Sequence, residues 1–268
     1  MVIAVISGKG GVGKTTTTAN IGLGLAMNNK KVIVVDFDIG QRNLDMILGL
    51  ENRVIYDMVQ VMDGECKLAQ ATIRSKVDKR LHFLAASQSK DKSVLNSRKI
   101  KKLLEDLDKD FDYIILDAPA GIESGYEHTI EFCDRAVIVV NPEVSSIRDA
   151  DKAIGILDSK SEKVKQGGEI TKYLIINRID AEMVQAGKML SSDDILDLLD
   201  IPLVGKIPED KGVIDASNKG VPVILNEKSE AGKAYMRVAK RFTGEQVDFP
   251  DVENPKKGLF KKLGGMFS

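Results

Sequence analysis

Residues 7–16 read Ser-Gly-Lys-Gly-Gly-Val-Gly-Lys-Thr-Thr, and this stretch decides the fold. It follows the apolar run VIAVIS at 2–7 and opens a helical pattern over 14–28. Residues 8–15 fit the motif G-x-x-x-x-G-K-[ST], in which glycines let consecutive backbone N–H groups turn inward around an anion. The N-terminus of the following helix adds a partial positive charge. The sequence therefore predicts a phosphate-binding loop between the first strand and the first helix.

The last residues of the loop have separate expected roles. Lys14 would reach the β- and γ-phosphates of a nucleotide, and the Thr15 hydroxyl would bind Mg²⁺. A glycine-rich turn without a ligand is the plain alternative, but the motif and its place between strand and helix both favour a phosphate site. The residues expected around the phosphates are Gly10, Gly11, Val12, Gly13, Lys14, Thr15 and Thr16.

Apolar runs alternate with helical patterns along most of the chain. The runs are rich in Val and Ile and most lack polar alternation, which is typical of strands buried on both faces of a parallel sheet. The sequence therefore predicts an α/β fold, a doubly wound and mostly parallel sheet of about seven or eight strands flanked by helices. The expected strands lie at 2–7, 31–36, 81–86, 112–117, 135–140, 173–177 and 202–207, and the expected helices at roughly 14–28, 93–107, 124–133, 146–159, 190–199 and 229–242.

The charge of the chain is nearly balanced, but its last residues are basic. The 268 residues carry 39 basic and 40 acidic side chains, a net charge of −1, which argues against a surface that coats nucleic acid. The final thirteen residues hold four lysines and no acid, so the remainder has 35 basic against 40 acidic groups. We expect a P-loop domain over 1–243, a linker over 244–255 and a basic tail over 256–268.

Nothing in the sequence predicts export or a membrane span. The two cysteines, Cys66 and Cys133, are far apart and not in metal-ligand spacing, which fits free thiols in a reducing compartment. The N-terminus lacks the basic start and cleavage site of a signal peptide. No apolar run approaches the roughly 20 residues that cross a bilayer. We therefore expect a cytoplasmic protein.

Acidic residues follow two of the predicted strands. Asp36 and Asp38 end the second strand, and the period of two puts both on the same side of the strand end. Asp117 ends the fourth strand in a Walker B pattern and would hold Mg²⁺ through water. Doubly wound sheets bind ligands at the carboxyl ends of their strands. Three such acids beside a phosphate loop indicate nucleotide hydrolysis, although Asp36 and Asp38 could also be ordinary turn aspartates.

The segment KGGVGKT (9–15) resembles the deviant Walker A signature of the MinD/ParA-type ATPases. In that family the early lysine, Lys9 here, reaches across a homodimer that forms with ATP and contacts the partner's nucleotide. A cation supplied in this way stabilises transition-state charge. The resemblance further implies that Asp38 positions or deprotonates the attacking water and that Asp36 supports the Mg²⁺ shell. Without the resemblance, Lys9 reads as a solvated loop lysine.

The base-binding residues are expected at the ends of the last two strands. The sequence INRID (176–180) is close to the Asn-Lys-x-Asp pattern by which many GTPases read guanine. The family resemblance instead implies adenine, and therefore ATP, although Asp180 leaves GTP open. The residues that would frame the base are Asn177, Arg178, Pro208, Glu209 and Asp210.

The resemblance to the MinD branch of this family covers essentially the whole chain. The segments at 36–45, 116–123, 141–151 and 207–210 occur in the same order and spacing. It implies an ATPase that positions the division site, recruits a MinC-like septum inhibitor and is released by a MinE-like stimulator. Asp149 and Asp151 match the family's partner-binding positions. The alternative for both is a solvated helix start, where acids are favoured.

The basic tail has the pattern of an amphipathic helix that lies on an anionic membrane surface. Each lysine near such a surface contributes about 1 kcal/mol, so one copy binds marginally and two copies on one dimer bind tightly. We therefore expect a cytoplasmic protein that attaches reversibly to the inner face of the cell membrane. A disordered tail, or a helix docked on its own body, is the alternative. The residues expected at the membrane are Lys257, Leu259, Phe260, Lys261, Lys262, Leu263 and Phe267.

Other functions remain open from sequence. A flagellar-number or polar-positioning ATPase of the same superfamily can also carry an amphipathic tail. A ParA-type DNA-partition ATPase fits less well, because the body is acidic overall and DNA binding is therefore not expected. A metabolic, kinase-like P-loop enzyme would leave both Lys9 and the tail without a role.

Overall fold

Within residues 1–122 and 125–254, which the computed structural model describes, eight strands form one sheet in the order β3-β4-β2-β5-β1-β6-β7-β8. Neighbouring strands are parallel except β3, which pairs antiparallel with β4. This confirms the predicted fold and all seven predicted strands. The strands are β1 (Val2–Ile6), β2 (Val32–Asp36), β3 (Ile73–Arg74), β4 (Leu81–Leu84), β5 (Tyr113–Asp117), β6 (Arg135–Val140), β7 (Thr171–Ile179) and β8 (Leu203–Pro208).

The central strands are buried on both faces, as their unbroken apolar runs predict. In β1, Ile3 and Val5 belong to one hydrophobic cluster, whereas Val2, Ala4 and Ile6 belong to another. Successive side chains of a strand point to opposite faces, so each cluster takes alternate residues. The sheet therefore separates two cores, one on each side.

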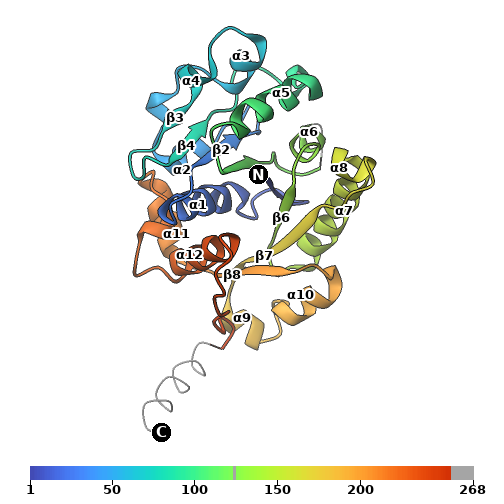
Figure 1. The fold of residues 1–268 in the computed structure, drawn as a ribbon. Coiled ribbons are helices and arrows are strands. Elements are labelled where there is room, and N and C mark those ends of the chain that lie inside the picture. The colour runs from blue at the N-terminus through green and yellow to red at the C-terminus, as the bar shows by residue number, and fades with distance from the viewer. Residues whose placement is uncertain (123–124, 255–268) are drawn as a thin grey trace.

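Helices cover both faces of the sheet. Figure 1 shows α1 and α12 side by side on one face and α7 on the other. The first face is covered by α1 (Lys14–Met27), α2 (Leu44–Leu48), α11 (Lys211–Asn218) and α12 (Glu230–Phe242), and the second by α5 (Ser97–Asp108), α6 (Tyr126–Ile130), α7 (Val144–Lys160) and α10 (Ser192–Leu199). Shorter helices are α3 (Met58–Asp63), α4 (Leu68–Ala71), α8 (Glu162–Lys165) and α9 (Ala181–Gln185), with 3₁₀ turns η1 (Glu51–Arg53), η2 (Lys92–Val94) and η3 (Val223–Leu225).

Helix α5 begins later than the sequence pattern predicts. Asn96 caps it by accepting backbone N–H groups of Arg98 and Lys99, and the preceding residues form the separate turn η2. A side-chain cap of this kind satisfies N–H groups that the helix itself cannot pair. Helix α10 likewise begins at Ser192, with Ser191 as its cap.

The segment expected to be a linker contacts the folded body over residues 244–254, which we call the C-terminal strap. The Arg241 guanidinium of α12 donates to the carbonyl oxygens of Val247 and Asp248 and lies 3.6 Å from the ring centroid of Phe249. At its end, the Glu253 carboxylate accepts the backbone N–H of Ser192 at 2.8 Å. The strap thus joins the end of α12 to the start of α10.

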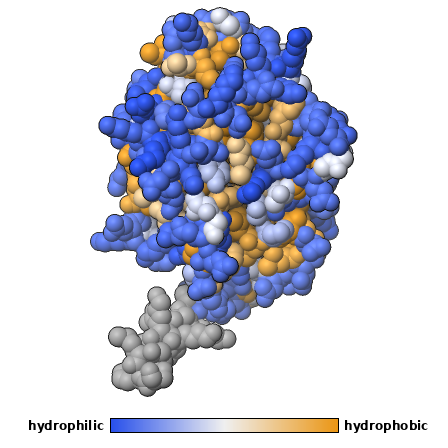
Figure 2. Space-filling view, viewed as in Figure 1, coloured by the Kyte–Doolittle hydropathy of each residue, from blue (hydrophilic) through white to orange (hydrophobic). Residues whose placement is uncertain are grey.

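The predicted amphipathic tail, 256–268, lies outside the described residues. In the part of the chain that is described, no helix is long and apolar enough to cross a membrane. The face seen in Figure 2 is largely hydrophilic, with smaller hydrophobic areas between the charged side chains. Scattered apolar residues of this kind are ordinary on a protein surface.

Candidate functional site

The phosphate loop connects the end of β1 to α1 at the carboxyl edge of the sheet. Gly11 and Gly13 have φ angles of 77° and 98°, in the left-handed region that glycine adopts without strain. Gly13 is the N-cap of α1, and a Cβ there would overlap the Asn177 amide. The loop therefore needs glycine for its backbone conformation and for its close packing against the end of β7.

Lys14 lies inside this loop and is only 6% exposed. Its ammonium group donates to the Ser7 hydroxyl at 3.0 Å. Burial lowers the pKa of Lys14, whereas the charges of Asp117 and Asp38 raise it. A buried cation held among carboxylates and glycine N–H groups fits the phosphates of a nucleotide.

Asp36 and Asp117 are direct neighbours on adjacent parallel strands, and both are fully buried. Thr18 of α1 donates to the Asp117 carboxylate at 3.0 Å. Burial raises the pKa of Asp117, while hydrogen bonds from Thr15 and Thr18 and the Lys14 charge lower it. This places Thr15 and Asp117 beside Lys14, as a shared site for phosphate and Mg²⁺ requires.

The Asp36 carboxylate organises the loop that follows β2. It accepts the backbone N–H groups of Asp38 at 2.9 Å and of Asn43 and Leu44 at 3.2 Å. Burial raises the pKa of Asp36, and the nearby Asp117 charge raises it further. Both oxygens of Asp36 are thus engaged in holding the loop that carries Asp38.

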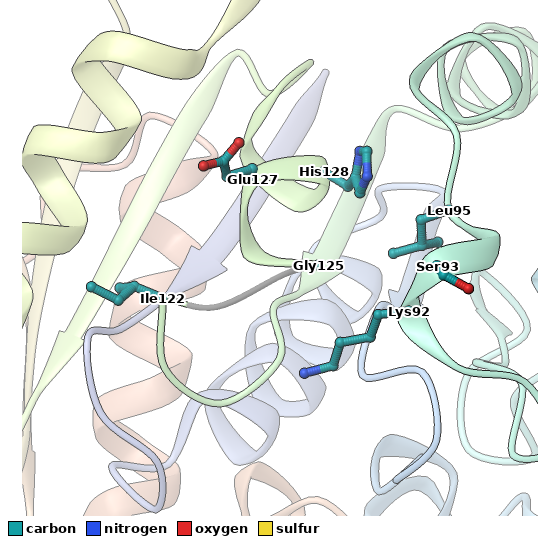
Figure 3. A pocket seen from close by; sticks show the side chains of 7 residues that line it. All are labelled: Lys92, Ser93, Leu95, Ile122, Gly125, Glu127 and His128. Carbon is teal, nitrogen blue, oxygen red and sulfur yellow. The ribbon is translucent and has the colours of Figure 1, made fainter.

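Asp38 is partly buried at the rim of the same site. Burial raises the pKa of its carboxyl, and the charges of Lys92 and then Lys14 lower it. Lys92 belongs to η2 and was not predicted from sequence. Its side chain lines a hollow of about 560 Å³ next to the loop after β5, and its stem would contact a Cβ at Gly125 (Figure 3).

Lys9, the second lysine of the loop, is engaged by α7 and not by the phosphate cradle. Its ammonium group lies 3.3 Å from the Glu143 carboxylate and 3.3 Å from the Ser145 hydroxyl. Both side chains of the ion pair are about half exposed, with 45% of Lys9 and 52% of Glu143 accessible. An exposed pair of this kind is readily exchanged for another partner.

Helix α7 also touches the loop through its backbone. A Cβ at Gly8 would overlap the carbonyl group of Asp149, so only glycine allows this approach. The Asp149 carboxylate forms an exposed ion pair with Lys152 at 3.4 Å, and Asp151 is exposed. The helix that carries both predicted partner-binding aspartates therefore packs directly on the phosphate loop.

The residues predicted around the base lie at the ends of β7 and β8. The Asn177 amide donates to the Val12 carbonyl oxygen at 2.7 Å, and Arg178 is exposed with a φ of 59°. The Asp210 carboxylate caps α11 by accepting the backbone N–H of Gly212, and it also accepts the Ser229 hydroxyl at 2.6 Å.

Pro208 is the last residue of β8, and the exposed Glu209 follows it. The backbone N–H of Glu209 donates to the Ile179 carbonyl oxygen. Asn177 is thus in contact with the phosphate loop, while the Asp210 side chain supports the local structure.

Residues 1–122 and 125–254 contain no group of three or more acidic, His or Cys side chains placed to hold a metal alone. Mg²⁺ keeps several waters and is bound by one or two protein groups together with substrate phosphates. Thr15 and Asp117 are the groups here that suit that role.

Sequence reasoning missed Ser7, Lys92, Glu143 and Ser145. Ser7 and Ser145 carry no motif signal, because serines next to a glycine loop or at a helix start are common. Lys92 and Glu143 reach the site from loops far from it in sequence. Only the strand order, which places β6 next to β1, brings Glu143 to Lys9.

Comparison with known proteins agrees with this geometry. The sequence profile of the AAA domain family matches residues 1–167. The septum site-determining protein MinD of Helicobacter pylori is 54% identical over 268 residues, covering 100% of this chain and 99% of that protein.

Two solved structures extend the comparison. A chain of the MinC:MinD cell division protein complex of Aquifex aeolicus has a TM-score of 0.84 at 45% identity, covering 93% of this chain and 98% of that one. The septum site-determining protein MinD of Pyrococcus horikoshii, complexed with Mg-ADP, has a TM-score of 0.78 at 28% identity, covering 90% of this chain and 95% of that one. Identity of this extent over the full chain shows that the protein belongs to the MinD family of septum site-determining ATPases.

Proposed function

We propose that this chain is a switch in which ATP binding forms a homodimer that attaches to the membrane and recruits a MinC-like inhibitor of septation. Hydrolysis, accelerated by a MinE-like stimulator, releases it. The observation that carries this proposal is the placement of the two lysines of the phosphate loop. Lys14 is buried in the cradle, whereas Lys9 is exposed and engaged by α7.

The nucleotide would be held by this chain's own loop. Gly10–Gly13 present backbone N–H groups, Lys14 neutralises the β- and γ-phosphates, and Thr15 and Asp117 suit the Mg²⁺ position. The Pyrococcus horikoshii relative, complexed with Mg-ADP, supports the same choice of ligands. Mg²⁺, when bound, neutralises charge that develops on the phosphates during transfer.

Asp38 would orient or deprotonate the attacking water. Its carboxylate is held near Lys14 by the loop that Asp36 organises, and it is only partly buried, so water can reach it. Burial raises the pKa of its carboxyl, and the charges of Lys92 and Lys14 oppose that rise. An ionised carboxylate at the rim of the phosphate site suits a general base or a group that positions water.

Lys9 would act on the nucleotide of a second copy of the chain. In a single chain its ammonium group rests on Glu143 and Ser145, and Lys14 already serves the phosphates. A cation that arrives from a partner stabilises charge in the transition state and also ties the two chains together. Dimer formation and competence for hydrolysis would then depend on the same residue.

Helix α7 is the proposed docking surface for the inhibitor and the stimulator. It carries Asp149 and Asp151, packs against Gly8 and receives Lys9. A partner bound there would contact the same helix that packs against Gly8 and Lys9 of the phosphate loop. The relative in the MinC:MinD complex of Aquifex aeolicus supports an inhibitor of the MinC type.

We further propose that adenine is the base that is bound. In the guanine-reading pattern the final aspartate must be available to the base, but the Asp180 carboxylate here caps α9, accepting the N–H groups of Glu182 at 2.9 Å and Met183 at 3.1 Å. One carboxylate oxygen of Asp180, Oδ1, is thus engaged by its own helix, and we take this as favouring ATP over GTP.

Molar mass in solution tests the switch. The wild type and Asp38→Ala would be measured by light scattering with Mg-ATP and with Mg-ADP. We expect monomers with ADP, and a stable dimer in the variant with ATP, because nucleotide binds and is not hydrolysed. A variant that stays monomeric with saturating ATP would refute the proposal.

A further inference from the structure

A second hollow lies at the opposite edge of the sheet from the phosphate loop. It has a volume of about 730 Å³, within the range of small-molecule sites. Lys31 precedes β2, Phe111 precedes β5, and His82 is the second residue of β4, so these residues mark the amino-terminal edge of the parallel strands. Helix α4 and strand β3, which lie together with β4 in the upper part of Figure 1, supply the other wall.

Positive charge is concentrated in this hollow. Lys31, Arg53 and Arg74 line it, and Asp110 is the one acidic residue among the lining side chains. Asp110 lies 3.8 Å from the Lys31 ammonium group. Arg53 donates to the Arg74 carbonyl oxygen at 2.7 Å, and in residues 1–122 and 125–254 neither guanidinium forms a salt bridge. Three cations against one acid leave about two positive charges to be balanced, in a body that is acidic overall.

The floor of the hollow is built and not merely a surface depression. His82 is 8% exposed, and its ring packs edge-on against Phe111 with the centroids 5.0 Å apart. The Lys31 ammonium group lies 5.1 Å from the centroid of the same ring. The His82 Nδ1 atom lies 3.2 Å from the Arg80 carbonyl oxygen, which fixes the ring in place. This packing orders the floor of the hollow beside Lys31, while Arg53 and Arg74 are exposed at its rim.

We propose that this hollow binds a phosphomonoester, a small molecule that carries a phosphate dianion, separately from the nucleotide site. A phosphomonoester has a charge of about −1.5 to −2 at neutral pH, which matches the unbalanced charge of the lining. Guanidinium groups recognise phosphate through paired N–H donors, and the lining contains two guanidinium groups, those of Arg53 and Arg74. The apolar wall at Phe111 and Leu68 gives room for the organic part of the ester.

His82 is a reporter for such a ligand. Burial lowers its pKa, the hydrogen bond to Arg80 raises it, and the charges of Arg74 and Lys31 lower it. An anion placed among these cations stabilises the imidazolium form, so binding raises the pKa of His82. The chain has two histidines, His82 in this hollow and His128, which lines the other hollow together with Lys92. The imidazole NMR spectrum therefore contains one reporter inside the proposed site and one outside it.

The experiment uses the full chain saturated with Mg-ADP, so that the phosphate loop is blocked. The two histidines would be titrated with pH in glycerol 3-phosphate and in NaCl of equal ionic strength. We expect the ester to raise the pKa of His82 by about one unit, with His128 unchanged. A His82 pKa that is the same in both solutions would overturn the proposal.

Variants show whether the lining is responsible. Arg53→Gln and Arg74→Gln should each weaken the ester's apparent affinity, read from His82, by roughly ten-fold or more. Lys79→Gln is the matched control, because Lys79 is an exposed lysine of the turn between β3 and β4 that does not line the hollow. Equal binding by wild type and both arginine variants would also overturn the proposal, and an unchanged His128 signal shows that each variant is folded.

A final arm distinguishes a free ester from a lipid headgroup. Glycerophosphoglycerol, the soluble headgroup of an anionic phospholipid, carries a single-charged phosphodiester. Weaker binding of this compound than of glycerol 3-phosphate supports the free phosphomonoester. Binding of equal or greater strength contradicts the choice of a dianion and assigns the site to a lipid headgroup.

Discussion

The ammonium group of Lys9 lies 3.3 Å from the carboxylate of Glu143, and Glu143 is the residue that precedes α7. This contact joins the outer lysine of the phosphate loop to the helix that carries Asp149 and Asp151. Half-exposed ion pairs contribute only about 0.2–1 kcal/mol, so the contact can be replaced when a phosphate of a second copy becomes available. Its weakness suits a residue that must change partners.

Substitution of Lys9 and substitution of Lys14 should therefore have different effects. Lys9→Ala should retain ATP affinity but lose the ATP-dependent dimer and stimulated hydrolysis, because in the proposed dimer its cation acts on the partner's nucleotide. Lys14→Ala should lose nucleotide binding itself, because Lys14 is the buried cation of the cradle. Equilibrium binding of a fluorescent ATP analogue, together with molar mass in ATP, checks both. Identical behaviour of the two variants would show that this division of roles is wrong.

Gly8 should be essential for a steric reason. A Cβ at this position overlaps the Asp149 carbonyl group, and neither backbone can move cheaply. We expect Gly8→Ala to lower the free energy of unfolding by about 1–3 kcal/mol and to weaken ATP binding. Gly10→Ala is the control for thermal or urea unfolding, because its Cβ would lie 3.5 Å from Ala120 in ordinary contact. Equal stability of both variants would contradict the proposed packing of α7 on the loop.

The sheet was predictable because its central strands leave a strong signal. Runs such as 135–140 are apolar at every position after the first, since both faces are buried. Strand β3 was not predictable, because two residues carry no periodicity. Several helices of four to six residues, such as α4 and α9, were missed for the same reason, whereas α6 lies within the helix predicted at 124–133.

The candidate site was predictable where residues end a strand or belong to the glycine motif. Asp36 and Asp117 were expected at the carboxyl edge, and the structure makes them neighbours in register. The contacts of Lys9 with Glu143, and the approach of Lys92 to Asp38, depend on strand order and loop paths that no local pattern encodes. Asp180 shows the opposite case, since a motif that suggests base recognition is here a helix cap.

Deletion of residues 256–268 should separate nucleotide binding from membrane attachment. We expect unchanged ATP affinity and an unchanged ATP dimer, but loss of sedimentation with anionic vesicles in ATP. Two tails on one dimer gain avidity of roughly 10²–10⁴, so the full chain should sediment with ATP and only weakly with ADP. A milder variant, Leu263→Gln, should give an intermediate result. Sedimentation of the truncated chain at the wild-type level would show that the tail is not the anchor.

Base preference should follow from the engagement of Asp180 with α9. Unlabelled ATP should displace a bound fluorescent ATP analogue at a lower concentration than GTP does. Asp180→Ala should lower stability by about 1 kcal/mol through loss of the cap, yet leave the ratio of ATP to GTP affinity unchanged. A preference for GTP, or a change in that ratio on substitution, would show that Asp180 reads the base.

Glu253 should stabilise α10 from the far end of the C-terminal strap. Its carboxylate accepts the Ser192 N–H at 2.8 Å, and Gln185 donates to its carbonyl oxygen at 2.7 Å. We expect Glu253→Ala to lower the free energy of unfolding by about 1 kcal/mol and Glu253→Gln to lose less, because the amide keeps an acceptor oxygen. Urea unfolding gives the energies, and hydrogen exchange should show faster exchange at the start of α10 and in the strap.

The matched control for this change is Glu245→Gln at the other end of the strap. The Glu245 carboxylate forms an exposed ion pair with Lys240 at 3.5 Å, so its loss should change stability by less than about 0.5 kcal/mol. Equal protection of the strap in Glu253→Ala and in the control would mean that Glu253 does not hold it. Faster exchange confined to the Glu253 variant would show that the strap is part of the folded domain and that Glu253 holds it against α10.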